Sequence, residues 1–184
     1  KTFYQHPNAY YFKWGTQTDL YKPVDRQIDR VTFFHSCGFS PGRKGTDLLI
    51  KAFYNSKREG KLIIHSQVDL IEKIPELKKE IQILKEEKSL EIINKTVTAP
   101  GLYSHGDVYV YPSRLEGIGL TIAEAQSCGL FTIVSDQAPM NEFVLDTPNS
   151  RINIEKTYAR SDGYYWPQVD IQIEECPNIQ VCED

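Results

Sequence analysis

Stretches typical of strands alternate with stretches typical of helices along most of the chain, and this alternation limits the possible folds more than any other feature. β-Branched and aromatic residues predict strands at 30–35, 62–65, 90–94, 107–111, 131–135 and 151–154. Apolar residues at helical spacing predict helices at 46–58, 74–88 and 120–127, with a further helical turn or two at 140–145. Strands and helices that alternate over short connections form βαβ units, so we expect an α/β fold: a parallel sheet with helices on both faces.

Composition narrows the functions that such a fold can have. The chain is 40% hydrophobic with a formal net charge of −4, which argues against a nucleic-acid-binding domain driven by phosphate contacts. No apolar run approaches the roughly 20 residues of a membrane-spanning helix. We expect no metal site, because the chain contains no Asp-x-Asp and its cysteines lack the paired spacing of zinc ligands. Free thiols in a reducing, cytoplasmic location are expected for Cys37, Cys128, Cys176 and Cys182.

The loop after the first strand is one candidate site, because ligands of parallel α/β sheets bind at the carboxyl ends of the strands. Residues 36–46 contain Gly38 and the consecutive cations Arg43 and Lys44, directly before a helix. The Gly-Lys-Ser/Thr order of a P-loop is missing. Since a helix N-terminus already favours anions, this loop is either a phosphate site or an ordinary surface turn.

The loop after the fourth strand, residues 112–120, is the second candidate site. Two glycines around one residue let the backbone approach a ligand, and the following helix directs its first N–H groups at the same spot. A diphosphate suits this arrangement. The residues concerned are Gly117, Ile118, Gly119 and Leu120. In the alternative interpretation Ser113 and Glu116 form a capping box, although the glycines follow where a capped helix would already run.

Two carboxylates bracket this glycine turn. Glu124 lies eight positions after Glu116, and Glu72 and Glu80 share that spacing, so the spacing alone selects nothing. The pair at 116 and 124 differs because it encloses a Gly-x-Gly turn and a helix start. A carboxylate has two acceptor oxygens that suit a ribose diol, so the arrangement predicts a nucleotide sugar with its diphosphate at the turn. Thr96, after the third strand, is a candidate for contacting the edge of the base.

Taken together, these residues resemble the signature of the retaining glycosyltransferases of family 4 (group 1), which have the two-domain GT-B fold. The likeness covers roughly residues 15–145 and implies the C-terminal, Rossmann-like half of that fold. Its parts are Pro112-Ser113, the run from Glu116 to Leu120, Glu124-Ala125, Gly129, and the segments 15–23, 44–53 and 107–110.

The resemblance implies a domain that binds a nucleotide-sugar donor, with a UDP-linked sugar favoured and no further cofactor. Lys44 would neutralise the diphosphate, and Glu116 would contact hydroxyls of the transferred hexose or N-acetylhexosamine, so both are expected catalytic residues. Glu124 would hold the ribose, while amides of residues 117–120 would steady the leaving phosphate. The acceptor would be a glycan or a lipid-linked molecule, and no metal would be needed.

One position departs from the family pattern. The family often has an arginine five positions before its lysine, where this chain has Phe39. Arg43 is a candidate to supply that charge from another direction.

The organisation expected for the chain has three segments. These are a lead-in at 1–30, a nucleotide-sugar-binding domain at 31–150, and a last strand with an acidic tail at 151–184. Because the chain starts at Lys1 and the family's acceptor-binding half is missing, we expect a fragment that depends on an N-terminal domain of the same protein for transfer. Family members often build surface polysaccharide, so peripheral association of the full-length protein with the inner membrane face is expected by analogy. A non-catalytic nucleotide-binding module and a nucleotide-sugar epimerase of similar architecture stay open as alternatives.

Overall fold

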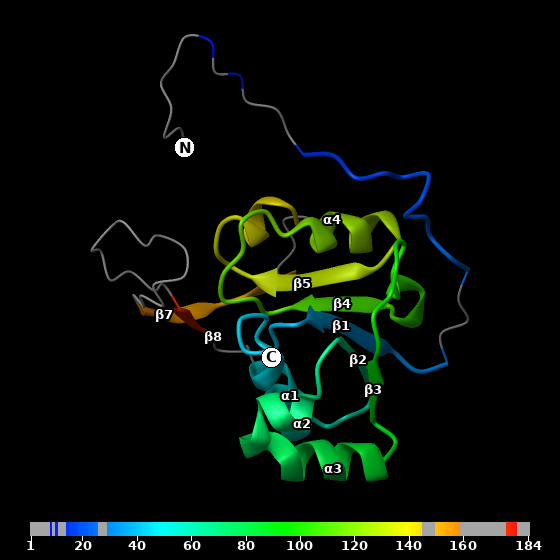
Figure 1. Ribbon diagram of the computed structural model, residues 1–184, viewed down its shortest axis with the longest axis vertical. Coiled ribbons are helices and arrows are strands. Elements are labelled where there is room, and N and C mark those ends of the chain that lie inside the picture. The colour runs from blue at the N-terminus through cyan, green and yellow to red at the C-terminus, as the bar shows by residue number, and fades with distance from the viewer. Residues whose placement is uncertain are drawn as a thin grey trace.

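The computed structural model describes residues 8, 10, 14–25, 29–144, 150–158 and 176–179. Strands and helices alternate in it as the sequence predicts (Figure 1). The strands are β1 (Thr32–Gly38), β2 (Lys61–Ser66), β3 (Leu90–Asn94), β4 (Val108–Tyr111), β5 (Phe131–Ser135), β6 (Arg151–Ile152), β7 (Ile154–Tyr158) and β8 (Cys176–Ile179). The α-helices are α1 (Thr46–Asn55), α2 (Leu70–Lys73), α3 (Lys78–Glu86) and α4 (Leu120–Ser127), and the 3-10 helices are η1 (Pro75–Leu77), η2 (Tyr103–His105) and η3 (Met140–Glu142).

Six strands form one sheet in the order β3-β2-β1-β4-β5-β6. Each neighbouring pair in this sheet is parallel. Strands β1 to β3 extend the sheet in one direction and β4 to β6 in the other, so the strand order reverses between β1 and β4. A crevice opens at the carboxyl ends of the strands where the order reverses, and ligands of open α/β sheets bind there. The loops after β1 and β4 are the two that the sequence singles out as anion sites.

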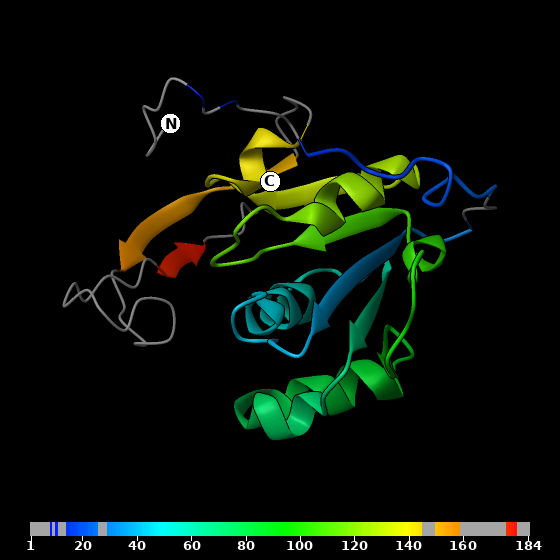
Figure 2. The same ribbon diagram turned by 45° about the horizontal axis from the view of Figure 1, so that its top comes forward.

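The sheet separates two hydrophobic cores. Leu62 and Ile64 of β2 pack in the core that α1, α2 and α3 cover, whereas Ile63 packs in the core that α4 covers. Figure 2 shows α4 on one face of the sheet and the other three helices on the opposite face. The prediction of a parallel sheet with helices on both faces is confirmed. Cys37 and Cys128 are buried in separate cores, and they form no disulfide with each other.

The helix predicted over 74–88 is present as η1 followed directly by α3, which ends at Glu86. A short helix, α2, begins earlier, and the Asp69 carboxylate caps it by accepting hydrogen bonds from the N–H groups of Ile71 and Glu72 at 2.7 and 3.2 Å. Pro75 has no N–H to donate and disfavours the helical conformation in the residue before it, so it separates α2 from η1 and α3. The helix predicted over 46–58 also ends early, at Asn55, since Ser56 is extended.

The last strand predicted over 151–154 divides into two. Its first half, β6, extends the parallel sheet by pairing with β5. The chain then enters β7, which pairs with β8 as an antiparallel two-stranded sheet beside the main one (Figure 1). The acidic tail, to which the sequence assigns no structure, thus contains a strand. Within the described ranges, no helix has both the length and the apolar character needed to cross a bilayer.

Candidate functional site

The loops after β1 and β4 are joined by close backbone contact. Gly45 has φ +69°, and a Cβ at this position would lie 2.0 Å from the carbonyl oxygen of Pro112, a contact that no side chain allows. The N–H of Arg114 donates to the carbonyl of Arg43 at 2.9 Å. The Arg114 guanidinium also makes a two-point ion pair with Asp47 on α1, at 2.7 and 2.8 Å. The two loops therefore form one structural unit.

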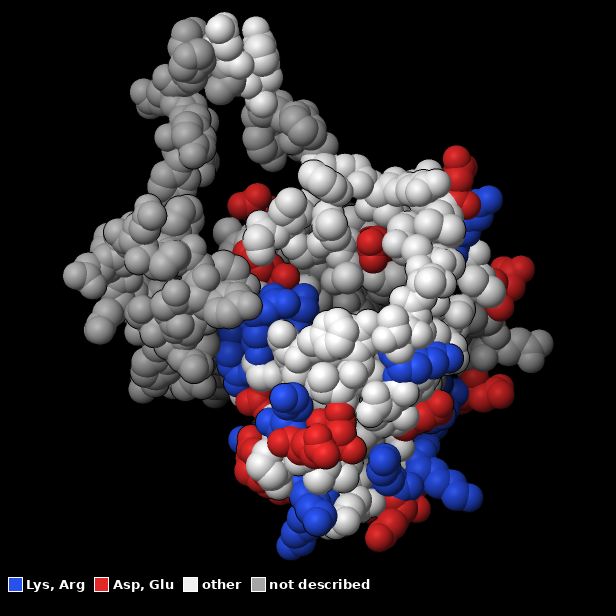
Figure 3. Space-filling model, viewed as in Figure 1, with Lys and Arg blue, Asp and Glu red and all other residues white. Residues whose placement is uncertain are grey.

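The carboxylate of Glu116 lies at the centre of this unit. Its Oε1 accepts hydrogen bonds from Arg43 at 2.7 Å, from Lys44 at 2.6 Å and from the Ser113 hydroxyl at 2.6 Å. The Glu116 side chain is 10% exposed and that of Lys44 13%, so solvent screens their ion pair only weakly. Figure 3 shows Lys and Arg gathered over this edge of the sheet, near the start of α1.

This charge arrangement controls the ionisation of Glu116. Burial by itself would raise the pKa of the carboxyl, but the ammonium of Lys44, the Ser113 hydroxyl and the charge of Arg43 outweigh it, and the pKa lies below its usual value. Glu116 is therefore an anion at neutral pH. It carries a negative charge directly beside the two cations that the sequence assigns to phosphate binding.

Lys44 has a second partner. Its Nζ donates to the hydroxyl of Tyr111 on β4 and lies 4.5 Å from the centre of that ring. An ammonium has three N–H donors, and Glu116 and Tyr111 engage two of them. No described residue accepts a hydrogen bond from the third N–H, so this donor is available to an anionic ligand.

Helix α4 begins without a side-chain cap from any described residue. Its N-cap is Gly119 in the left-handed conformation, with φ +79°. The capping box proposed for Ser113 and Glu116 does not form, since the Ser113 hydroxyl bonds to the Glu116 carboxylate instead. Ile118 and Leu120 are exposed on either side of Gly119. The first N–H groups of such a helix have no acceptor within the helix and are available to an anion.

Glu124, one helical turn further along α4, lines two cavities at the same edge. The larger, of about 180 Å³, lies between the ends of β1 and β2 and the segment that follows β3. Its lining includes Ser36, His65, Tyr103 and the run from Val97 to Leu102. The smaller, of about 70 Å³, lies between α4 and residues 14–17 of the lead-in segment.

Most of the predicted site residues lie together, and three lie apart from them. The residues that lie together surround the start of α4: Arg43, Lys44, Glu116, Gly117, Ile118, Gly119 and Leu120. Glu124 belongs to the cavity beside them. Gly38 ends β1 with φ +55°. Thr96 is exposed and is not among the residues that line the larger cavity, where the following residues, from Val97 on, take its place.

Sequence reasoning missed two side chains at this edge, Tyr103 and His65. Tyr103 donates its hydroxyl to Glu124 Oε2 at 2.5 Å. His65 donates from Nε2 to the carbonyl of Lys95 at 2.8 Å, which leaves Nδ1 to accept from the Ser36 hydroxyl at 2.9 Å. His65 ends a predicted strand, whereas Tyr103 lies in the connection between two predicted strands, and their positions in the sequence carry no other signal.

The fold and the two joined loops define a Rossmann-like domain in which Arg43 and Lys44 lie at the edge where the strand order reverses. The sequence profile of the family described as "Glycosyl transferases group 1" matches residues 30–159. The chain belongs to this family, and the resemblance found in its motifs is confirmed.

Similar proteins agree with this assignment. The chain is 33% identical over 75 residues to sucrose synthase 6 of Arabidopsis thaliana, a match that covers 34% of this chain and 8% of that protein. The Anabaena protein HepE, solved in complex with UDP and glucose, shares 22% identity at a TM-score of 0.62, over 76% of this chain and 41% of HepE. The C-terminal domain of LpcC, a group 1 glycosyl transferase of Francisella tularensis, shares 18% identity at a TM-score of 0.59 over 72% of this chain and 76% of that domain.

These coverages define which part of a transferase the chain represents. It spans 8% of the sucrose synthase and 41% of HepE, but its structural match extends over most of the separate LpcC domain. The expectation of the C-terminal, Rossmann-like half of a GT-B fold is confirmed.

Proposed function

We propose that this chain is the donor-binding half of a retaining glycosyltransferase that uses a nucleoside-diphosphate sugar. The donated group would be a hexose or N-acetylhexosamine, and the acceptor a glycan or a lipid-linked molecule. A UDP-linked donor is favoured, because HepE binds UDP and glucose and the pneumococcal O-GlcNAc transferase GtfA binds UDP and GlcNAc. A cytoplasmic location and a membrane contact of the full-length protein stay predictions from the resemblance.

The observation that carries the proposal is the position of Lys44 and Arg43 beside the uncapped start of α4. Departure of a nucleoside diphosphate concentrates negative charge on the leaving phosphate. Fixed donors aimed at that charge lower the barrier, and here they would be the Lys44 ammonium and the first amides of α4. In this proposal these groups supply the positive charge that a metal ion provides in other transferases, and no metal is required.

Glu124 and Glu116 would each contact a different part of the donor, the ribose and the transferred sugar. Glu124 lines the larger cavity, so we assign that cavity to the nucleoside and the carboxylate to the ribose diol. Glu116 uses Oε1 for its three donors within the domain. Its Oε2 would then accept from a hydroxyl of the transferred sugar.

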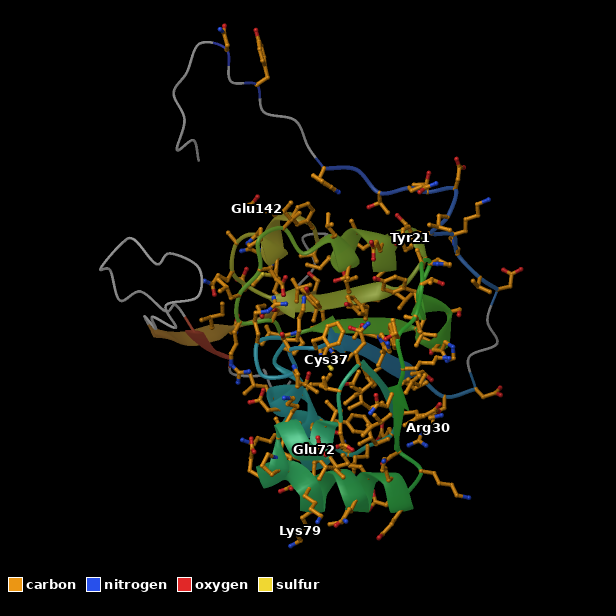
Figure 4. All side chains as sticks on the ribbon, viewed as in Figure 1. Tyr21, Arg30, Cys37, Glu72, Lys79 and Glu142 are labelled. Carbon is orange, nitrogen blue, oxygen red and sulfur yellow. The ribbon has the colours of Figure 1, made fainter. Side chains whose placement is uncertain are left out.

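Calorimetric titration with UDP-glucose tests the phosphate assignment. Lys44→Ala should weaken binding by about 10- to 150-fold, since a buried charge-assisted contact is lost. The matched control is Lys79→Ala, because Lys79 is exposed on α3 across the sheet from α4 (Figure 4). If the Lys44 variant bound UDP-glucose as tightly as the parent, the assignment of this loop would be wrong.

A comparison of UDP with UDP-glucose separates the proposal from a non-catalytic nucleotide-binding module. A donor site that contacts the sugar through Glu116 should distinguish the two ligands, whereas a module that recognises the nucleotide alone should bind them equally. An epimerase of similar architecture would also bind the donor. It differs in releasing an epimerised sugar from the full-length protein, which chromatography of the products detects.

A further inference from the structure

The Glu124 carboxylate is held by a hydrogen-bond donor inside the domain. The hydroxyl of Tyr103, in η2, donates to Glu124 Oε2 at 2.5 Å, across from α4. A carboxylate carries two acceptor oxygens, and the protein takes one of them here. Glu124 also lines both cavities at this edge. The carboxylate therefore has a fixed partner on one side and faces two cavities on the other.

The Tyr103 ring is itself held in place. It is 6% exposed and makes edge-on contacts with Tyr21 at 6.0 Å, Phe34 at 6.0 Å and Tyr109 at 5.7 Å between ring centres. The segment that carries Tyr21 runs past the end of α4 (Figure 4). Burial raises the pKa of Tyr103 far above its usual value, and the neighbouring Tyr109 and Glu124 add to that effect. The hydroxyl thus keeps its proton and acts as a donor at all working pH values.

A fixed donor changes what a glutamate can do for a ligand. A free glutamate side chain samples several rotamers, and ordering one of them on binding lowers affinity. The bond from Tyr103 selects one orientation before any ligand arrives. Two adjacent hydroxyls, as in a ribose, need a carboxylate with a defined direction to accept from both.

We infer that Tyr103 is a positioning residue, which orients Glu124 so that its carboxylate accepts from the ribose diol of the donor. This inference rests on the proposed function, because it assumes that the ligand is a nucleotide. Tyr103 acts through Glu124 and touches no reacting atom. The competing interpretation is that Tyr103 only fills the aromatic core.

The chain offers a matched control for this distinction. Tyr109 belongs to the same aromatic cluster and is fully buried, and its hydroxyl has no hydrogen-bond partner among the described residues. Tyr103→Phe and Tyr109→Phe each remove one buried hydroxyl and leave the ring in place. The first change removes the bond from Tyr103 to Glu124, and the second leaves that bond intact.

Titrations of UDP and of 2′,3′-dideoxy-UDP into the parent and both variants test the inference. Tyr103→Phe should weaken UDP binding by roughly 5- to 30-fold and leave binding of the dideoxy nucleotide unchanged. Tyr109→Phe should leave both unchanged. Equal losses for the two nucleotides in Tyr103→Phe, or UDP binding as tight as that of the parent, would overturn the inference.

Failure of the proposed function has a different signature. A parent chain that binds neither nucleotide overturns the proposed function, and the ribose role of Tyr103 with it. The positioning of Glu124 is then decided by crystal structures of the ligand-free parent and Tyr103→Phe. Movement of the Glu124 carboxylate in the variant supports positioning, whereas an unmoved carboxylate contradicts it.

Discussion

Lys44 Nζ lies 2.6 Å from Glu116 Oε1, although 72 positions separate the two residues in the chain. The lysine follows β1 and the glutamate follows β4, and the adjacency of these strands brings the residues together. Arg43 reaches the same oxygen at 2.7 Å. Without any ligand, Glu116 therefore already forms ion pairs with the two cations that would bind a diphosphate.

Glu116→Gln should raise affinity for free UDP while reducing the preference for UDP-glucose. The change removes the negative charge beside Lys44 and Arg43, so we expect UDP to bind about 3- to 10-fold more tightly. UDP-glucose should gain less, because the amide is a weaker acceptor for a sugar hydroxyl. Calorimetric titration with UDP and with UDP-glucose measures the ratio of the two affinities. Glu72→Gln, an exposed change on α2, is the control, and a loss of UDP affinity in Glu116→Gln would contradict the prediction.

Gly45→Ala should destabilise the domain and weaken nucleotide binding together. The left-handed conformation, φ +69°, and the 2.0 Å approach to the Pro112 carbonyl both resist a Cβ, so we expect a loss of at least about 2 kcal/mol of unfolding free energy. Gly42→Ala is the control in the same loop, because a Cβ there meets open space. Urea unfolding measures both variants. Equal stability of the two would show that the loops do not approach as described.

His35 should make the stability of the domain depend on pH. The imidazole is fully buried, and its Nδ1 donates to the Val110 carbonyl while Nε2 accepts from the Thr46 hydroxyl, both at 2.8 Å. Burial lowers the pKa of His35 from 6.5 to about 4, and the charge of Lys44 acts in the same direction. Between these two pH values the unfolded chain takes up a proton that the folded chain does not.

The contribution of His35 is therefore complete above pH 6.5 and is lost as the pH falls to about 4, an effect of about 3 kcal/mol. His35→Gln removes the titration. Urea denaturation at several pH values gives the unfolding free energy of the parent and of this variant. The difference between the two should become smaller as the pH falls from 6.5 to about 4. A difference that stays constant with pH would rule out a buried, neutral His35.

This chain by itself should bind the donor but transfer no sugar. The match to HepE covers 41% of that protein, and we propose that the acceptor is bound by a region outside this chain. Incubation of the 184-residue chain with UDP-glucose and candidate acceptors, followed by analysis for glycosylated product, is the measurement. Turnover at a rate comparable with that of the full-length protein would contradict the proposal that a region outside this chain binds the acceptor.

Local patterns account for most of the architecture. The runs of β-branched and aromatic residues in β1 to β5 and the apolar residues at helical spacing in α1 and α4 lie within short segments, and these elements form close to where they are predicted. The errors occur where local signals compete. The sequence missed α2, which owes its start to a cap from Asp69 rather than to periodicity, and Pro75 separates α2 from the predicted helix.

For the site, the sequence by itself determined the chemistry of each loop: two cations before a helix, and a glycine turn between two carboxylates. Only the tertiary structure decided which groups meet. The β-branched and aromatic runs specify that strands form, but the order β3-β2-β1-β4 depends on how the whole sheet packs its two cores. For that reason the contact of Glu116 with Lys44 appears only once β1 and β4 lie side by side, and that of Glu124 with Tyr103 only once α4 packs beside η2.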